Sequence, residues 1–130
     1  MQIRVYYEDT DAGGIVYHSN YLNFCERARS DVFFQKGLSP VLGSGQFVAK
    51  KIMAEYLASA KLGDVLEVYS ELLEIKGASF ELLQRVFKEQ KKVFELRIVL
   101  VYVTFEGRPQ KITSEVKSLI DSLFLTSGME

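Results

Sequence analysis

The sequence predicts an α+β fold in which an antiparallel sheet wraps around one long helix. Two observations favour this fold class: one amphipathic helix pattern lies near the start of the chain, and four consecutive strand patterns follow it. The links between those strands are short, whereas parallel strands need a crossover of about a dozen residues. With 130 residues, we expect a single domain over residues 1–130 and a sheet of about five strands.

The N-terminal part of the chain contains a short strand, a loop and the helix. Residues 3–7 have strand-forming character, and the polar, glycine-rich residues 8–14 interrupt it. The apolar residues that follow are spaced for one face of a helix of about four or five turns: Tyr21, Phe24, Cys25, Ala28 and Val32. We expect Ser19 or Asn20 to cap this helix and Gly37 to end it.

Four strand-like segments follow the helix, at residues 46–59, 65–75, 79–88 and 93–105. Short polar or glycine-containing links separate them, so we expect consecutive strands to pair as antiparallel hairpins. Residues 114–125 are predicted to form a closing helix.

The last predicted strand is apolar on both faces. One face carries Leu96, Ile98 and Leu100, and the other carries Val99 and Val101. A helix can cover only one side of the sheet, so the other side needs a partner. We therefore expect a homo-oligomer, with a dimer as the minimum.

The composition excludes several classes of protein. The formal net charge is −1, from 16 basic and 17 acidic side chains, so we expect no nucleic-acid partner. No apolar run reaches the roughly 20 residues that cross a bilayer, and the N-terminus lacks the pattern of a secretory signal. We therefore expect no transmembrane segment and a cytoplasmic location. With one cysteine and one histidine, the chain has no internal disulfide and no ligand set for zinc, so we expect metal-free chemistry.

Residues 6–21 hold the densest group of chemically reactive residue types. They include three carboxylates, two adjacent glycines, the only histidine and the predicted start of the helix. A carboxylate can act as a nucleophile or a general base, and glycines let the backbone approach a ligand closely. Free N–H groups at the start of a helix can stabilise an oxyanion. Acyl transfer needs these parts together.

The pattern Y-x-D-x-D-x-x-G-x-V-x-x-x-x-Y, from Tyr7 to Tyr21, resembles the signature of the 4-hydroxybenzoyl-CoA thioesterase superfamily. The longer run YYEDTDAGGIVYHSNYLNFCERAR is similar to its Tol–Pal-associated acyl-CoA thioesterase branch, and the likeness continues through AEYLASAKLGD over nearly the whole chain. The resemblance implies the hotdog fold, a long central helix wrapped by an antiparallel sheet. It also implies dimers, often paired again as tetramers, with active sites at the dimer interface.

The same resemblance implies roles for individual residues. Asp11, the second acid of D-x-D, matches the catalytic carboxylate, and the backbone N–H of His18 is implied to polarise the thioester carbonyl. The side chain of His18 is also implicated, and Tyr7 matches a motif position near the site. No cofactor is required.

Three residues are expected to contact the substrate. Gly14 and Val16 match motif positions, and Lys61 is our candidate for a contact with the CoA phosphates. The branch resemblance favours aliphatic acyl-CoA as substrate.

Other interpretations of single residues are weaker. A calcium-binding EF-hand loop that began at Asp9 would need a bidentate Glu at its twelfth position, where Asn20 stands. Asp9 is better interpreted as a residue that caps the loop. Ser44 lacks the G-x-S-x-G context of a serine hydrolase, and Cys25 falls on the apolar face of the helix, as packed core residues do.

Two classes of function stay open at this point. The first is an enzyme that hydrolyses aliphatic acyl-CoA to free acid and CoA, with Asp11 as nucleophile or general base. The second is a non-catalytic hotdog protein that binds acyl-CoA or acyl carrier protein, or that serves as a scaffold for the Tol–Pal system. The presence of Asp11 and His18 favours the enzyme.

Overall fold

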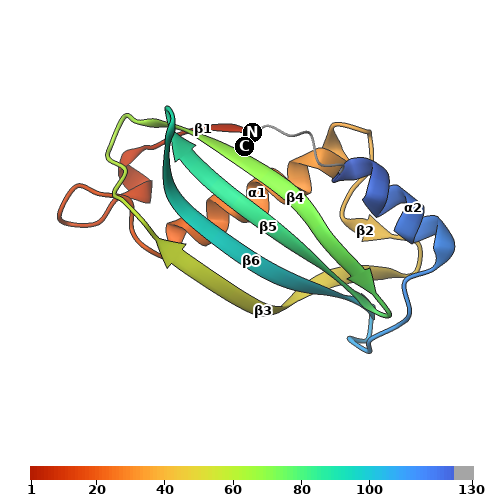
Figure 1. Ribbon diagram of the computed structural model, residues 1–130. Helices are drawn as coiled ribbons and strands as arrows, with labels where there is room; N and C mark the ends of the chain where they lie inside the picture. Colours follow the sequence, from red (N-terminus) through yellow and green to blue (C-terminus); the bar gives the residue numbers. More distant parts are fainter. Residues whose placement is uncertain (125–130) are drawn as a thin grey trace.

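The computed structural model describes residues 1–124 as a long helix that lies against one face of a six-stranded antiparallel sheet (Figure 1). The elements along the chain are β1 Gln2–Arg4, the 3-10 turn η1 Tyr7–Asp9, α1 Asn20–Phe34, β2 Val41–Leu42, β3 Gly45–Tyr56, β4 Val65–Lys76, β5 Ser79–Lys88, β6 Lys91–Thr104 and α2 Ser114–Leu123. The strand order is β1-β4-β5-β6-β3-β2. The predicted α+β architecture is confirmed.

Helix α1 buries the face that its spacing predicts. Tyr21, Phe24, Cys25 and Ala28 are buried against the sheet, whereas Val32 is half-buried and Phe33 takes the last core position. The predicted cap is confirmed in its position but not in a side-chain hydrogen bond. Ser19 is the N-cap residue, but its backbone is already helical and its side chain makes no capping bond. The predicted stop is confirmed, because the chain turns at Gly37 with a φ of 73°.

The core lies between α1 and the inner face of the sheet. The inward residues of β6 are all buried: Phe94, Leu96, Ile98, Leu100 and Tyr102. On the other face of β6, Val99 and Val101 are only half-buried. Within residues 1–124, no layer covers this outer face of the sheet (Figure 1). We expected this for a single chain, because one helix can cover only one side of a sheet.

The structure adds one short strand and corrects the ends of two others. The sheet has six strands rather than about five, because the two-residue β2 pairs with the start of β3. β1 ends at Arg4 instead of residue 7, since the N–H of Tyr6 donates to Asp9 Oδ2 and turns the chain into η1. β3 ends at Tyr56 instead of residue 59.

The closing helix is confirmed as α2. The Thr113 hydroxyl accepts a hydrogen bond from the N–H of Val116 at 3.2 Å and so caps the start of the helix. The helix extends to Leu123, and the predicted end at residue 125 lies outside the described residues. Within residues 1–124, neither α1 nor α2 is long and apolar enough to span a membrane.

Candidate active site

The loop between η1 and α1 brings Asp11 to the surface of a cavity. The loop folds back on itself, because the N–H of Asp11 donates to the carbonyl of Ile15 at 2.9 Å and the N–H of Gly14 donates to the carbonyl of Asp11 at 3.0 Å. Gly14 has a φ of 82°, a conformation that favours glycine. The Asp11 carboxylate accepts a hydrogen bond from the N–H of Gly13 at 2.8 Å. This turn holds the carboxylate in place while leaving it exposed.

Asp9 has a different environment, although it stands only two residues earlier. Its side chain is buried, and the residue is 4% exposed. Its carboxylate accepts hydrogen bonds from the N–H of Tyr6 at 2.8 Å and from Asn20 Nδ2 at 2.7 Å. Its carbonyl accepts from the N–H of Tyr17 at 2.9 Å. Asp9 therefore ties η1 to the start of α1, and the loop-capping interpretation is confirmed.

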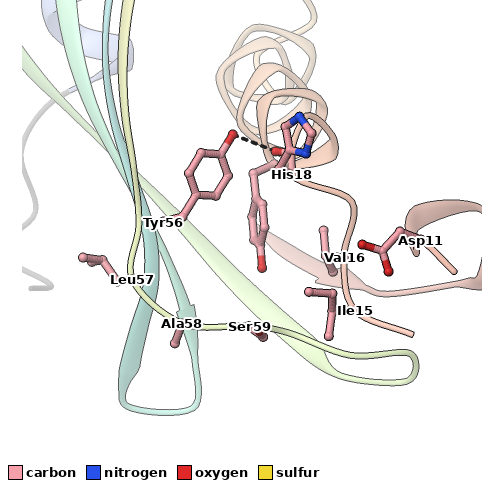
Figure 2. A pocket seen from close by; sticks show the side chains of 9 residues that line it. Asp11, Ile15, Val16, His18, Tyr56, Leu57, Ala58 and Ser59 are labelled. Atoms are coloured by element: carbon pink, nitrogen blue, oxygen red, sulfur yellow. Dashed lines mark hydrogen bonds between the residues drawn. The ribbon is translucent and has the colours of Figure 1, made fainter. Parts of the chain in front are cut away.

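A cavity of about 340 Å³ lies between this loop, the start of α1 and the end of β3 (Figure 2). Its lining residues are Asp11, Ile15, Val16, His18, Tyr21, Tyr56, Leu57, Ala58 and Ser59. Figure 2 shows Asp11 and His18 on the loop side, with Tyr56 and Leu57 across from them. The volume falls in the range of small-molecule sites.

The backbone around His18 offers an unused donor. In the described part of the chain, no acceptor is recorded for the N–H groups of His18 and Ser19, which immediately precede α1. The carbonyl of His18 accepts a hydrogen bond from the Tyr56 hydroxyl at 2.9 Å (Figure 2). Free N–H groups at the positive end of a helix dipole favour negative charge on a nearby oxygen. The cavity is therefore lined by Asp11, which carries a carboxylate, and by His18, whose backbone N–H has no recorded acceptor.

Tyr56 is a lining residue that the sequence did not reveal. It comes from the end of β3, and its ring contacts Tyr21 and Phe94, with ring centroids 5.9 and 5.0 Å apart. Tyr21 is itself buried and stacked on Phe94 at 4.8 Å, and burial raises its pKa above the usual value. This aromatic cluster fixes the orientation of the Tyr56 ring.

The structure brings together only some of the predicted site residues. Asp11, Val16 and His18 line the cavity, but Tyr7, Gly14 and Lys61 are not among its lining residues. The Tyr7 side chain points to solvent, with the residue 81% exposed. Lys61 lies beside the site, because its backbone bridges to Ile15.

The segment around Lys61 supports the site loop from outside. The carbonyl of Ala60 accepts a hydrogen bond from the N–H of Val16 at 2.9 Å. Asp64 Oδ2 accepts a hydrogen bond from the N–H of Lys61 at 2.8 Å and lies 3.1 Å from Lys88 Nζ. Partial burial by itself would raise the pKa of Asp64, but the N–H of Lys61 and the Lys88 ammonium outweigh it and hold the pKa below its usual value.

Two further observations bear on the chemistry of the chain. Cys25 is fully buried in the helix face, as its spacing predicts, and burial raises the pKa of its thiol to about 12. Within residues 1–124, no three His, Cys, Asp or Glu side chains are grouped so as to hold a metal ion.

Comparisons with known proteins identify the family. Residues 13–95 match the model of the thioesterase superfamily, a match that begins two residues after Asp11. The acyl-CoA thioesterase YbgC of Helicobacter pylori is 43% identical over 95 residues, which are 73% of this chain and 71% of that protein. The acyl-CoA thioesterase YbgC of Haemophilus influenzae is 38% identical over 129 residues and 93% of each chain.

A solved structure agrees with these sequence matches. The YbaW probable thioesterase from Escherichia coli superposes with a TM-score of 0.82 at 25% identity, over 95% of this chain and 97% of that chain. The helix wrapped by an antiparallel sheet is the hotdog fold that the resemblance implied. The chain therefore belongs to the thioesterase superfamily, in the branch of the YbgC acyl-CoA thioesterases.

Proposed function

We propose that this protein is an acyl-CoA thioester hydrolase whose reaction takes place in the cavity between Asp11, His18 and Tyr56. The observation that carries this proposal is that one cavity is lined both by the exposed Asp11 and by His18, whose N–H has no recorded acceptor. Family membership supports the reaction class. The substrate is an aliphatic acyl-CoA, and the products are the free acid and CoA.

Asp11 supplies the nucleophile or the general base. In the first case its carboxylate attacks the thioester carbonyl carbon, CoA leaves as thiolate, and water hydrolyses the resulting mixed anhydride. In the second case Asp11 removes a proton from the water that attacks. In both cases the N–H of His18 donates to the carbonyl oxygen as negative charge develops on it. The His18 side chain lines the same cavity and orients substrate or water there.

The remaining predicted contacts surround this centre. Gly14 lets the loop turn close to the substrate, Val16 provides an apolar wall, and Lys61 binds the CoA phosphates from the rim. Tyr7 is exposed on the loop side and contacts the part of the substrate outside the cavity. A cytoplasmic location fits the proposed substrate, because coenzyme A thioesters are intracellular metabolites.

The test is thiol release from acyl-CoA esters of increasing chain length, with a benzoyl ester included. Wild-type protein is compared with the isosteric Asp11→Asn variant and with His18→Ala. We expect hydrolysis of aliphatic esters that Asp11→Asn abolishes while circular dichroism shows an unchanged fold. Absence of release from every ester would leave the non-catalytic alternative, a protein that binds acyl groups or serves as a Tol–Pal scaffold. A parallel assay with acyl carrier protein thioesters tests that second acyl donor.

We also propose that the working unit is a homodimer formed through the edge of β3. Beyond Gln46, β3 has no strand on its outer edge in the described part of the chain, and it exposes Val48 and Met53 there. An unpaired apolar edge strand is a surface for pairing with another chain. The cavity residues Tyr56 and Leu57 stand at the end of this edge, so a second copy would cover the site.

Light scattering combined with size exclusion tests this interface. The variant Val48→Lys/Met53→Lys is expected to be monomeric and to lose activity because its site stays open. Leu73→Lys changes an exposed leucine on β4 and serves as the matched control, with the oligomer unchanged.

A tetramer would in addition use the half-buried outer face around Val99 and Val101. In that case Val101→Lys converts tetramers to dimers that keep their activity, and an unchanged mass would exclude this face.

A further inference from the structure

A second cavity lies beside the middle and end of α1. It has a volume of about 190 Å³, and its lining residues include Arg29, Phe33, Ala49, Phe80 and Phe124. Its inner end is aromatic, because the ring of Phe124 lies 6.0 Å from the rings of both Phe33 and Phe80. The guanidinium of Arg29 is turned to the side, where it donates to Gln84 Oε1 at 3.2 Å. The cavity is thus apolar at its end and polar along one wall.

Both cavities lie along the same two elements. The active-site cavity uses Tyr21 of α1 and Tyr56 of β3, whereas the second cavity uses Arg29 and Ala49 of the same elements. Eight residues of helix separate Tyr21 from Arg29, which corresponds to about 12 Å.

The strip of β3 between the two cavities is apolar and open. Ile52 and Ala54 pair with the buried residues Ile98 and Leu96, so they point to the same inner face of the sheet. Both are nevertheless exposed. A hydrocarbon chain can therefore run from one cavity to the other along these two apolar side chains.

The dimer proposed above, with two paired β3 edges, offers a second route between the two kinds of cavity. A two-fold antiparallel pairing over the free stretch from Phe47 to Tyr56 puts the start of one strand beside the end of the other. The active-site cavity of one protomer then faces the second cavity of its partner.

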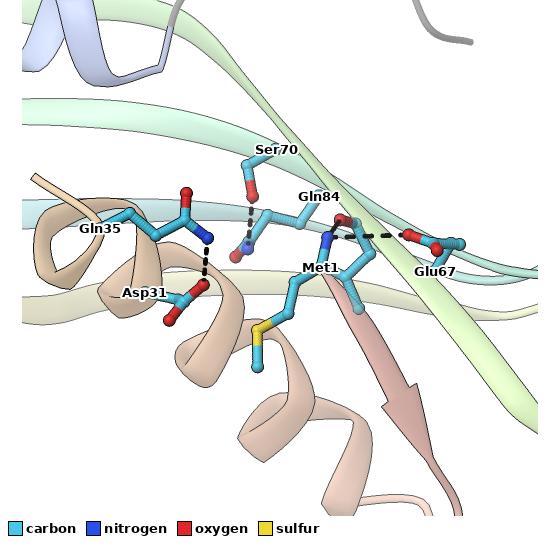
Figure 3. Close-up of polar contacts among 7 residues, drawn as sticks. Met1, Asp31, Gln35, Glu67, Ser70 and Gln84 are labelled. Atoms are coloured by element: carbon cyan, nitrogen blue, oxygen red, sulfur yellow. Dashed lines mark hydrogen bonds and ion pairs between the residues drawn. The ribbon is translucent and has the colours of Figure 1, made fainter.

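Phe124 separates the second cavity from a third. The third cavity has a volume of about 430 Å³, and its lining residues include Met1, Asp31, Gln35, Glu67 and Phe124. Figure 3 shows its polar side, where Gln35 Nε2 donates to Asp31 and the Met1 amino group lies near Glu67. Phe124 is 2% exposed and lines both cavities, so its ring is the end wall of the apolar one.

From these observations we infer that the second cavity binds the distal end of a straight acyl chain and that Phe124 limits the length of that chain. The inference rests on the proposed thioesterase function, because the acyl chain is attached to CoA through the thioester that lies near Asp11. A cavity of about 150 Å³ holds a benzene molecule, so the second cavity accommodates a segment of roughly six carbon atoms. Beyond it, the ring of Phe124 stops the chain.

The experiment measures kcat/KM for a series of saturated acyl-CoA esters that differ by two carbons. For wild type, each methylene that enters the cavity raises kcat/KM by about fourfold, and the value falls once the chain meets Phe124. Phe124→Ala is expected to move the optimum to chains longer by at least two carbons. Ala49→Leu fills the same cavity from the exposed strand β3 and is expected to move the optimum to shorter chains.

Ile120→Ala is the matched control. Ile120 is fully buried in α2 but lines neither the second nor the third cavity, so this variant loses packing and keeps the optimum. Calorimetric binding of alkyl-CoA thioethers, which cannot be hydrolysed, must follow the same length dependence. An optimum unchanged in folded Phe124→Ala, or unchanged in Ala49→Leu, would overturn the inference. Failure of wild type to release thiol from any ester would instead remove the proposed function itself.

Discussion

The two halves of the motif before α1 differ in how completely their polar groups are bonded. In the first half, Asp9 is buried, and hydrogen bonds to Tyr6 and Asn20 occupy both of its carboxylate oxygens. In the second half, Asp11 is exposed, accepts one hydrogen bond from Gly13 and faces a cavity. The same residue type thus serves the structure at one position and remains available to a ligand two residues later.

The difference also shows why residue type alone does not identify a catalytic group. A buried carboxylate whose oxygens both accept bonds from the protein is out of reach of a substrate, and its removal strands its donors. An exposed carboxylate contributes little to stability and can be replaced without unfolding the chain. The two aspartates therefore predict opposite outcomes in assays of activity and of stability.

The largest expected effect is on catalysis at Asp11. The substitution Asp11→Asn keeps the shape of the side chain and its acceptor for Gly13, but it removes the base or nucleophile. We expect kcat to fall by at least about 100-fold. The free energy of unfolding, from urea titration followed by circular dichroism, should change by less than about 0.5 kcal/mol. A large loss of stability would place Asp11 with Asp9 and remove the contrast.

The next effect is on stability at Asp9. The substitution Asp9→Ala leaves the N–H of Tyr6 and the Asn20 amide without their acceptors in a partly buried position. We expect the free energy of unfolding to fall by about 1–3 kcal/mol, the usual cost of stranded buried donors. Asn23→Ala, which removes a neighbouring exposed bond to Asn20, is the control and should change stability by less than about 0.5 kcal/mol. Equal effects of the two variants would contradict the structural role of Asp9.

The sequence predicted the residues of the site that lie close together along the chain. Asp11, Val16 and His18 belong to one loop and one helix start, so their spacing carried enough information to group them. Tyr56 could not be found in this way, because it is 38 residues from His18 and only the pairing of β3 brings it there. The role of Tyr7 stays a prediction, because this residue of the 3-10 turn is exposed and does not line the cavity.

The fold, like the site, was predictable where it depends on residues that lie close together along the chain. Long elements with a clear period, such as α1 and β6, were recognised with nearly correct bounds. The two-residue β2 has no period at all, and its pairing depends on Gly45. A side chain at Gly45 would collide with the Val103 carbonyl and with Gln110, residues that lie far away in the sequence. Contacts between distant segments thus decide what local patterns cannot.

A smaller effect is expected from Tyr56, which belongs to neither half of the motif. The substitution Tyr56→Phe removes only the hydroxyl that donates to the His18 carbonyl, and it retains the aromatic contacts with Tyr21 and Phe94. A single neutral hydrogen bond contributes about 1 kcal/mol, so we expect kcat to fall by about fivefold. KM should change less than kcat, because the bond orients the donor peptide rather than the substrate. A change confined to KM would show that Tyr56 binds substrate directly.

The smallest effect is expected on stability at Asp64. It tests whether burial or the number of hydrogen bonds distinguishes Asp9 from Asp11. Asp64 is bonded to the N–H of Lys61 and to Lys88, as Asp9 is bonded to two partners, but its side chain is partly exposed. We expect Asp64→Asn to lower the free energy of unfolding at pH 7 by less than about 1 kcal/mol, the usual size for a solvent-accessible pair.

The pH dependence of this difference follows from the direction of the pKa shift. The folded-state pKa of Asp64 lies below its unfolded value, so its contribution is complete above the ordinary aspartate pKa of about 3.9 and is lost as the pH falls through the folded value. Urea titrations of wild type and Asp64→Asn at pH 7, 5, 4 and 3 should therefore converge at the acid end. A loss at pH 7 as large as that of Asp9→Ala would mean that the number of bonds matters more than burial. A small loss that vanishes in acid would mean that burial makes Asp9 structural, while exposure leaves Asp11 free for chemistry.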